Sequence, residues 1–402
     1  MIDFKLRPYQ EKFAKQGLEI LREHKILILN LEVRCGKTFI AHQIGSSYKK
    51  VLFITKKKAI QSIKDDYELG DYSFDLTVVN YESLHKTKGT FDLVICDESN
   101  EKISAYPKPT LNAKRVKEFV SNDLILLTGT LLPESNSQIY HQLWVSKYSP
   151  FKAFKNFYAF HKALGVKKTL YTSYGEKPCY KEVPYNLIEP YVNNIKISFT
   201  QKESGFTANI KEVVHTVKMN PETIDLINRL KKDLVIEGEN EVILADTQVK
   251  LMAKLHQLSS GTIKFESGNS MIIDSSKIDY IKDKFKGKKI AFYYKFKEEY
   301  NLISSAFDLA KDIDEFDNSD KCIALQFVSG RSGIKLDKAD CIVAINIDFS
   351  ATTYFQFRAR MITSISLQSD IHWIFSDAGF EHQVLKAVEK KKNYTIQTFK
   401  KL

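Results

Sequence analysis

The first part of the chain is divided by five short apolar runs, and these runs are continuous rather than alternating. They span residues 26–31, 51–55, 76–80, 92–98 and 124–130, and helical stretches separate several of them. A strand buried on both faces of a sheet is apolar along its whole length, whereas a strand with one wet face alternates. Buried strands that alternate with helices are typical of a parallel sheet. We therefore predict an α/β domain here, preceded by a helix over residues 9–24 with Pro8 in its first turn.

A second series of apolar runs lies near the C-terminus, at residues 289–296, 322–327, 341–347 and 372–376. The segment between the two series is rich in Tyr, Phe and Lys and then in polar residues, Gly and Pro. We predict two parallel-sheet α/β domains in tandem, over residues 1–145 and 216–402, with an α-rich, aromatic and basic insertion over 146–215. Aromatic residues at helical spacing are usually core, although these could instead stack on bases: Trp144, Phe151, Phe154, Phe157 and Tyr158.

The net charge of +11 over 402 residues favours a polyanionic partner such as nucleic acid, although surplus Lys also serves solubility. The five Cys residues form no CxxC pair and have no metal-ligand spacing, which is typical of buried thiols in a reducing compartment. The sequence has no apolar run of 18 residues and no apolar signal region at its N-terminus. We expect a cytoplasmic protein with no membrane segment.

The stretch LEVRCGKT, residues 31–38, ends in Gly36-Lys37-Thr38, the ending of a phosphate-binding P-loop. The full pattern has another Gly where Leu31 stands, and a bare GKT tripeptide is common by chance. This one follows the run 26–31 and precedes the helical segment FIAHQI, where backbone N–H groups and the helix dipole can hold phosphates. In this interpretation Lys37 reaches the β- and γ-phosphates of a nucleotide, and the Thr38 hydroxyl binds Mg²⁺.

The second chemical motif is the pair Asp97-Glu98, which ends the run 92–98. The end of a buried strand is a suitable place for a carboxylate that holds Mg²⁺, with a neighbour that activates water. A lone Asp-Glu turn after a strand is common, but this pair follows the GKT motif in the expected order and at a plausible spacing. The two motifs together predict a site that binds and hydrolyses ATP.

Three weaker motifs follow. The tripeptide TGT at 128–130 closes an apolar run and alone is only a turn signal. The loop 328–340 places two Gly and small polar residues after a strand. The stretch YFQFRARM, residues 354–361, contains Gln356, Arg358 and Arg360. An Arg from a second domain can stabilise charge on a transferred phosphoryl group, although two nearby Arg usually mark a solvated helix face.

The motifs stand in the order LRPYQ, GKT, ITKKK, NYES, DES, TGT, SGRSGIKL and QFRAR. As an ordered set that covers nearly the whole chain, they closely resemble the superfamily-two helicases and, within them, the Swi/Snf-type branch. The chain looks most like the short Swi/Snf-like helicases of bacteriophages. In that branch an acidic residue opens the phosphate loop, and Glu32 matches it. The resemblance implies two RecA-like domains, ATP and Mg²⁺ as cofactors, and DNA-stimulated ATP hydrolysis.

The resemblance also implies a role for each matching residue. Arg7 and Gln10 match the motif that recognises adenine, and Cys35, Gly36, Lys37 and Thr38 match the phosphate loop, with Thr38 also a Mg²⁺ ligand. Asp97 matches the Mg²⁺ carboxylate, and Glu98 matches the base that orients the attacking water. Thr128 and Thr130 match the motif that couples hydrolysis to nucleic-acid contact. Arg331, Ser332 and Gly333 match a motif that contacts both the nucleotide and the nucleic-acid backbone. Gln356 and Arg360 match the last motif, with Arg360 as the arginine finger.

Three positions depart from the pattern of that branch. Asn100 stands in the acidic motif where His is common, which puts coupling through that residue in doubt. Thr363 stands where a second Arg is usual in the last motif, so either Arg358 substitutes for it or one finger operates. Arg34 stands where the loop usually has Gly, and we expect its side chain to point outward, towards base or ribose.

Small polar and Lys side chains that follow two predicted strands suit contact with a nucleic-acid backbone without base readout. These residues are Thr55, Lys56 and Lys57 after the second strand, and Asn80, Tyr81 and Ser83 after the third. Contacts of this kind release counterions, so we expect binding to weaken steeply with salt.

The predicted function is that of an ATP-dependent DNA helicase or translocase, with ATP between the two domains. We expect it to move on or remodel duplex or branched DNA in phage replication, recombination or repair, in the host cytoplasm. RNA is a less favoured track, and we expect a monomer. One alternative is a viral DNA-packaging motor, which normally adds a nuclease domain with clustered carboxylates. Another is a catalytically silent nucleic-acid-binding module, against which the intact Lys37, Asp97 and Glu98 argue.

Overall fold

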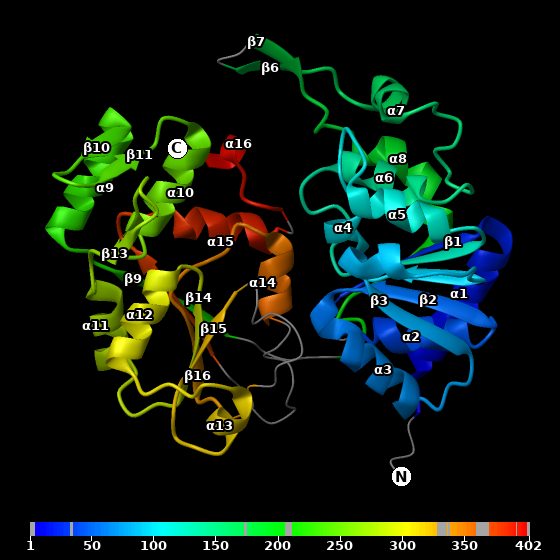
Figure 1. Ribbon diagram of the computed structural model, residues 1–402, viewed down its shortest axis with the longest axis horizontal. Helices are drawn as coiled ribbons and strands as arrows, with labels where there is room; N and C mark the ends of the chain where they lie inside the picture. Colours follow the sequence, from blue (N-terminus) through cyan, green and yellow to red (C-terminus); the bar gives the residue numbers. More distant parts are fainter. Residues whose placement is uncertain are drawn as a thin grey trace. The chain divides into compact units, whose positions relative to one another are not determined.

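The computed structural model of the protein describes residues 5–32, 35–172, 175–205, 211–327, 336, 338–358, 370–390 and 392–399. The chain divides into two compact units, Met1–Thr207 and Ala208–Leu402, which we call unit 1 and unit 2. Each unit is built on its own parallel sheet with helices against it (Figure 1).

Unit 1 contains a six-stranded sheet in which every pairing is parallel. In spatial order the strands are β3 (Asp75–Asn80), β2 (Lys50–Thr55), β4 (Leu93–Cys96), β5 (Asp123–Thr128), β1 (Ile26–Leu31) and β8 (Lys196–Phe199). The helices are α1 (Pro8–His24), α2 (Lys37–Gly45), α3 (Ile60–Leu69), α4 (Ser99–Lys102), α5 (Leu111–Phe119), α6 (Ile139–Trp144), α7 (Phe157–Leu164) and α8 (Tyr185–Val192). A hairpin of β6 (Thr169–Thr172) and β7 (Gly175–Pro178) extends from α7 (Figure 1).

The two faces of this sheet form separate cores, because successive residues of a strand point to opposite sides. On β1, Leu27 and Leu29 belong to a core with α1, α2 and α3, whereas Ile26 and Ile28 belong to a core with α5 to α8. All four side chains are at most 1% exposed. Each such burial contributes about 1.5–3 kcal/mol. Both faces therefore select apolar residues, which explains why the predicted runs are continuous.

The aromatic part of the 146–215 segment packs into the second of these cores. Phe151, Phe157 and Phe160 are at most 2% exposed, and the Phe151 and Phe160 rings lie 4.9 Å apart between centroids. Tyr158, in contrast, is 44% exposed and presents its ring to solvent. The interpretation of these aromatics as core is therefore confirmed for Phe151 and Phe157, and only Tyr158 of the five is freely accessible for stacking.

Unit 2 contains a five-stranded parallel sheet. In spatial order its strands are β15 (Ile323–Gln326), β14 (Ile290–Tyr294), β16 (Cys341–Ala344), β17 (Ile371–Ser376) and β9 (Glu212–Val217). The helices are α9 (Pro221–Asp233), α10 (Gln248–Leu258), α11 (Ser276–Lys284), α12 (Lys297–Ala306), α13 (Ile313–Asp317), α14 (Ala351–Arg358), α15 (Glu381–Glu389) and α16 (Ile396–Phe399). Two antiparallel hairpins pair β10 (Val235–Glu237) with β11 (Val242–Leu244) and β12 (Thr262–Lys264) with β13 (Ser270–Ile272).

Two strands of the parallel sheets were not anticipated from the sequence. β8 has the sequence KISF and pairs with β1, and β9 has the sequence EVVHTV and pairs with β17. Each lies at one end of its sheet order, where a strand has a single neighbour and is partly open to solvent. Such a strand does not need a continuous apolar run. The remaining strands of both sheets coincide with the predicted runs, and the predicted fold class of two RecA-like parallel-sheet units in tandem is confirmed.

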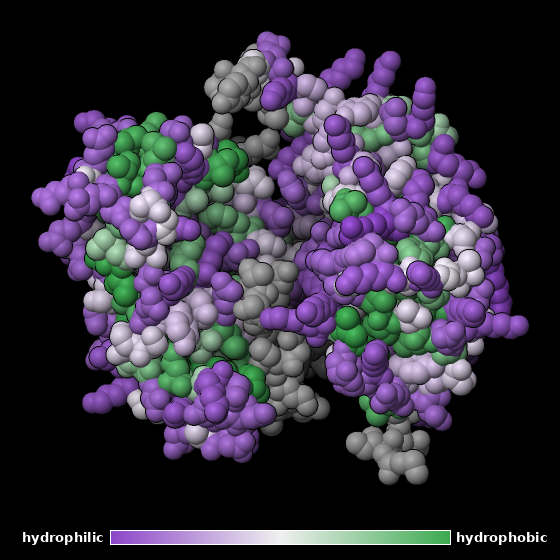
Figure 2. All heavy atoms as spheres, in the orientation of Figure 1, coloured by the Kyte–Doolittle hydropathy of each residue, from purple (hydrophilic) through white to green (hydrophobic). Residues whose placement is uncertain are grey.

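Hydrophilic side chains cover most of the visible face of both units, and hydrophobic side chains form small separate patches (Figure 2). Among the described residues, no helix combines the length and the apolar character that crossing a bilayer requires.

Candidate nucleotide-binding site

The residues predicted to bind and hydrolyse nucleotide converge at one edge of the sheet of unit 1. Because β1, β2, β4 and β5 are parallel, their carboxyl ends meet at that edge. Lys37 follows β1 and opens α2, Thr55 ends β2, Asp97 follows β4, and Thr128 ends β5. The order β2-β4-β5-β1 places the strand of the TGT motif between the strands that carry the acidic pair and the GKT motif.

Gly36 has a conformation and a contact that disfavour any other residue. Its φ is +73°, in the left-handed region, and it is the N-cap of α2. A Cβ on Gly36 would lie 1.8 Å from Gln10 Nε2. The buried Gln10 side chain is itself held in place, because its Oε1 accepts a hydrogen bond from Arg7 N at 2.8 Å. α1 and the phosphate loop are therefore fitted directly against each other.

The Lys37 ammonium lies at the carboxyl end of β1. Lys37 Nζ donates to the carbonyl oxygens of Leu31 at 2.8 Å and Glu32 at 3.3 Å. These carbonyl acceptors carry no net charge, whereas phosphate oxygens are anionic and would add a charge–charge attraction that the carbonyls lack. A nucleotide would therefore compete well for this ammonium, and the N-terminus of α2 lies beside it.

Asp97 is fixed by hydrogen bonds from two neighbouring segments. Thr55 Oγ1 donates to Asp97 Oδ2 at 2.8 Å, and the Tyr81 hydroxyl donates to the Asp97 carbonyl at 2.7 Å. Glu98, the next residue, has a φ of +48°, which is uncommon outside Gly. For an L-residue this conformation costs about 1–2 kcal/mol. Backbone strain of this kind often occurs at functional sites, where it aims a side chain.

Burial raises the pKa of both the Asp97 and the Glu98 carboxyl groups, and for Glu98 the adjacent Asp97 charge raises it further. The Thr55 hydrogen bond and the Lys37 and Lys56 ammonium groups act in the opposite direction on Asp97. The charge of Lys37 acts on both carboxyl groups, so the phosphate-loop cation and the acidic pair share one electrostatic environment. A carboxyl group with a raised pKa suits general-base chemistry near neutral pH.

The acidic motif and the TGT motif are linked by hydrogen bonds. Asn100 Nδ2 donates to Thr130 Oγ1 at 3.2 Å, and Thr130 N donates to Thr128 Oγ1 at 3.1 Å. Beside them, Ser99 Oγ donates to Gln142 Oε1 of α6 at 3.0 Å. Asn100 therefore supplies a polar connection at the position where the sequence analysis had placed coupling in doubt.

The residues predicted to contact nucleic acid fall into two groups. Thr55 and Tyr81 are fully buried, and their hydroxyls are used to hold Asp97. Lys56 pairs with Glu101 at 2.8 Å, and Asn80 Nδ2 donates to Glu82 Oε2 at 3.0 Å. Lys57 and its neighbour Lys58 are exposed, and Lys56, Asn80 and Ser83 are half-buried.

The predicted residues of unit 2 are only partly described. Gln356 lies on α14, whereas Arg331, Ser332, Gly333, Arg360 and Thr363, like Arg34 of unit 1, lie outside the described residues. Arg358 is paired within unit 2, because its Nε lies 2.5 Å from Glu212 Oε1. The same carboxylate accepts hydrogen bonds from the Tyr354 hydroxyl at 3.1 Å and from Trp373 Nε1 at 2.8 Å. Arg358 is therefore part of an anchored cluster that joins α14, β9 and β17.

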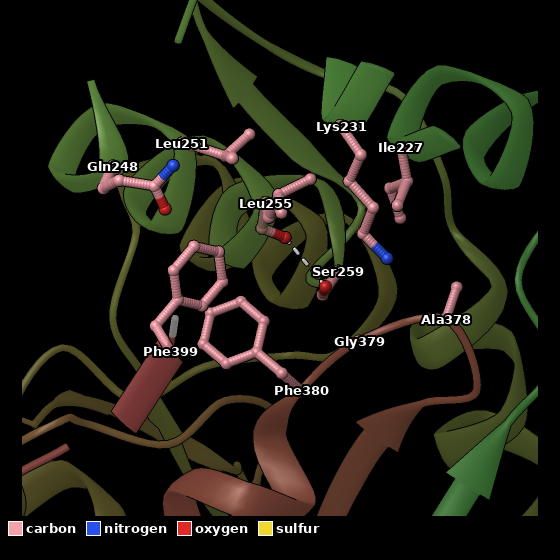
Figure 3. A pocket seen from close by; sticks show the side chains of 10 residues that line it. All are labelled: Ile227, Lys231, Gln248, Leu251, Leu255, Ser259, Ala378, Gly379, Phe380 and Phe399. Carbon is pink, nitrogen blue, oxygen red and sulfur yellow. Dashed lines mark hydrogen bonds between the residues drawn. The ribbon is translucent and has the colours of Figure 1, made fainter. Parts of the chain in front are cut away.

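Unit 2 also contains a cavity of about 520 Å³ (Figure 3). Its polar lining groups are those of Lys231, Gln248 and Ser259, and the rest of the lining is Ile227, Leu251, Leu255, Ala378, Gly379, Phe380 and Phe399. A triphosphate needs several N–H donors or cations, and this mostly apolar lining does not provide them. None of the lining residues belongs to the predicted site, so we do not assign nucleotide to this cavity.

The residues at the unit 1 edge fit Mg²⁺ bound to a nucleotide. No group of three or more His, Cys, Asp or Glu side chains in the part of the chain that the structure describes is arranged to hold a metal alone. Mg²⁺ in nucleotide sites usually takes one or two protein ligands and completes its shell with phosphate oxygens and water. The Asp97 carboxylate and the Thr38 hydroxyl are ligands of that kind.

Sequence reasoning missed the residues that hold these groups in place. It assigned Thr55 and Tyr81 to nucleic acid, although both contact Asp97, and it did not identify Glu101 or Gln142. Thr55 ends β2 next to the strand that carries Asp97, so the parallel strand order provides a signal for its role. No sequence signal points to Gln142, which reaches Ser99 from a helix far along the chain.

Comparisons with known proteins give structural similarity alone. No protein-family model matches the chain, and no curated protein matches its sequence. The chain is similar to the SWI2/SNF2 ATPase core of Sulfolobus solfataricus in complex with double-stranded DNA, with 15% identity, a TM-score of 0.45, and coverage of 97% of this chain and 92% of the other. It is similar to the same ATPase core domain without DNA at 14% identity and a TM-score of 0.44, with coverage of 97% and 89%. The fold assignment accordingly rests on the strand orders and pairings described above.

Proposed function

We propose that the protein is an ATP-dependent DNA translocase or helicase. The observation that carries the proposal is the convergence of Lys37, Thr38 and the Asp97-Glu98 pair at one edge of the unit 1 sheet. A phosphate-binding helix N-terminus beside two carboxylates is the arrangement that ATP hydrolysis requires. A nucleic-acid track is supported by the net charge of +11 and by the exposed Lys57 and Lys58 beside this edge, and the resemblance to Swi/Snf-type helicases favours DNA.

The roles of the residues follow from their chemistry. Lys37 binds the β- and γ-phosphates, and Thr38 and Asp97 hold Mg²⁺, which neutralises phosphate charge when bound. Glu98, with its raised pKa, orients the attacking water and takes up its proton. Gln10 and Arg7 bind the base, and Cys35 and Gly36 complete the loop. For Arg331, Gly333, Gln356 and Arg360 of unit 2 we propose the roles of the motifs that they match, with Arg360 stabilising the transferred phosphoryl group.

The link from Asn100 to Thr130 connects the acidic pair to the segment that follows β5. We infer that hydrolysis is transmitted along this link to the nucleic-acid contacts, which comprise Lys56, Asn80, Ser83 and Thr130 of unit 1 and Arg331 of unit 2. Thr55 and Tyr81 act on the track indirectly, through Asp97. The resemblance to phage helicases suggests phage DNA replication, recombination or repair as the setting.

ATP turnover of the purified chain tests the proposal. Turnover is measured alone and with single-stranded DNA, duplex DNA, forked DNA and RNA. We expect stimulation by duplex or forked DNA, and stimulation by forks above duplex would identify branched DNA as the substrate. Stimulation by RNA alone would replace DNA with RNA as the track. Absence of turnover under all of these conditions, with nucleotide and DNA still bound, would contradict the proposal and favour a catalytically silent binding module.

A further inference from the structure

Glu32 has an unusual position, because each of its polar groups is bonded to a different part of unit 1. Its N–H donates to the Phe199 carbonyl of β8 at 3.0 Å, and its carbonyl accepts from Lys37 Nζ at 3.3 Å and from Cys35 N at 3.3 Å. Its carboxylate Oε2 accepts from the backbone N–H of Gln201 at 2.9 Å. One residue thus contacts the strand β8, the phosphate loop and the segment after β8.

The segment after β8 is a closed turn over residues 200–205. Its backbone bonds run from Ser204 N to the carbonyls of Thr200 and Gln201, both at 3.1 Å, and the Ser204 hydroxyl donates to Gln201 O at 2.6 Å. The Glu203 carboxylate accepts from Thr200 N at 2.7 Å and closes the turn from its other side. These bonds are internal to the turn and hold it together as one unit. It ends just before Thr207, the last residue of unit 1.

The start of the turn is anchored to the helix that also contacts the phosphate loop. The Phe199 ring lies 4.8 Å from the Tyr9 ring and 4.9 Å from the Phe13 ring, centroid to centroid, on α1. Gln10 of the same helix packs against Gly36. Helix α1 therefore contacts both Gly36 of the phosphate loop and Phe199, the strand residue that directly precedes the turn.

We propose that Glu32 is a positioning residue that couples occupancy of the phosphate loop to the turn 200–205, which leads into unit 2. Lys37 is bonded to the Glu32 carbonyl in this structure and leaves it to bind phosphate, and the released residue then shifts so that its carboxylate binds the Gln201 amide more tightly. The carboxylate of the same residue carries that readjustment to the amide of Gln201. The proposal rests on the proposed ATPase function, and it adds the route by which the nucleotide reaches the connection between the units.

Hydrogen exchange at the Gln201 amide tests this coupling directly. It is measured in wild type, Glu32→Ala and Glu32→Gln, with and without a non-hydrolysable ATP analogue and Mg²⁺. Glu32→Gln keeps an acceptor oxygen, whereas Glu32→Ala removes it. The matched control is Glu19→Ala, at an exposed position of α1. Binding of the analogue is measured on the same samples.

We expect Gln201 to exchange at least about tenfold faster in Glu32→Ala than in wild type, because a bond to a charged acceptor is lost. In wild type and Glu32→Gln, the analogue should slow exchange at Gln201 by at least about fivefold, and Glu32→Ala should abolish this response. Because coupling is reciprocal, Glu32→Ala should also bind the analogue at least about fivefold more weakly, with Glu32→Gln within about twofold of wild type. A purely structural role would instead raise exchange throughout the unit 1 sheet.

Two results would overturn the inference while leaving the proposed function intact. The first is an equal response of the Gln201 amide to nucleotide in wild type and Glu32→Ala. The second is equal affinity of the two proteins for the analogue. Failure of wild type to bind the analogue at all would instead reject the proposed function, and the inference with it.

Discussion

Replacing Gly36 by Ala should disrupt the phosphate loop more than it disrupts the fold. The new Cβ meets two separate costs. A φ of +73° costs an L-residue about 1–2 kcal/mol. The Cβ would also lie 1.8 Å from Gln10 Nε2, so the buried Gln10 amide must move. This movement removes the hydrogen bond between Arg7 N and Gln10 Oε1, which costs about 0.5–1.5 kcal/mol more. The sum is about 1.5–3.5 kcal/mol.

The chain offers a control that carries the first cost without the second. Gly205 has a φ of +79°, close to that of Gly36, and a Cβ built on it has no heavy atom within 4 Å. Gly205→Ala should therefore destabilise unit 1 by the conformational cost alone, about 1–2 kcal/mol. The combination of Gly36→Ala with Gln10→Ala removes the clash, so its cost should be smaller than the sum of the two single substitutions. Chemical denaturation monitored by the fluorescence of Trp144, with Trp373 replaced by Phe, reports unit 1, and nucleotide binding is measured in parallel. Strict additivity, or equal costs at Gly36 and Gly205, would refute the reasoning.

Three further predictions concern single groups. His42 is fully buried and its pKa is lowered to about 4 by burial, so the unfolded chain takes up a proton that the folded chain refuses. The stability that neutral His42 contributes is complete above the unfolded pKa of about 6.5 and is lost, by up to about 3 kcal/mol, as the pH falls towards 4. The free energies of unfolding of His42→Phe and wild type, measured by urea denaturation, should therefore diverge below about pH 6.5. Parallel pH profiles of the two proteins would contradict this. Thr55→Val removes a hydrogen bond that favours the ionised form of Asp97, so the pKa of Asp97 should rise and the acid limb of the pH profile of ATP turnover should move to higher pH. Thr55→Ser keeps the hydroxyl and should leave the acid limb in place. An unmoved acid limb in Thr55→Val would be evidence against this role of Thr55. Lys277 and Glu381 form a buried ion pair at 3.1 Å in unit 2. Lys277→Met should lower the free energy of unfolding by about 3–5 kcal/mol, and Lys277→Met combined with Glu381→Leu should lower it much less, as measured by denaturation followed at Trp373 in a Trp144→Phe background. Equal costs for the single and double variants would show that the uncompensated Glu381 charge is not the cause.

The continuous apolar runs predicted the two sheets because burial on both faces leaves a strong trace in a sequence. Strands β1, β2 and β5 begin and end within two residues of the predicted runs. Leu27 and Ile28, which lie in different cores, show why both faces of β1 must be apolar. β8 left no such trace, because an end strand with one neighbour tolerates Lys196 and Ser198. Its register against β1 is set by tertiary contacts that no local pattern encodes.

For the candidate site, the sequence indicated which residues carry the chemistry but not what holds them. Lys37, Asp97 and Glu98 have functional groups whose spacing is informative by itself. The supports are different, because Tyr81 and Thr55 act through single hydrogen bonds that depend on strand order. The same is true of Gln10, whose buried amide meets Gly36 only after α1 has packed on the sheet.

Turnover and nucleotide binding of the Glu98→Gln variant test the central claim most directly. Glu98 is assigned to the water and not to the phosphates, so Glu98→Gln should bind ATP as wild type does and lose about 10²–10⁴-fold in DNA-stimulated turnover. Lys37→Ala, in the same assays, should lose both binding and turnover while unit 1 remains folded. Wild-type turnover in Glu98→Gln would contradict the assignment of this edge of the sheet as the site of ATP hydrolysis.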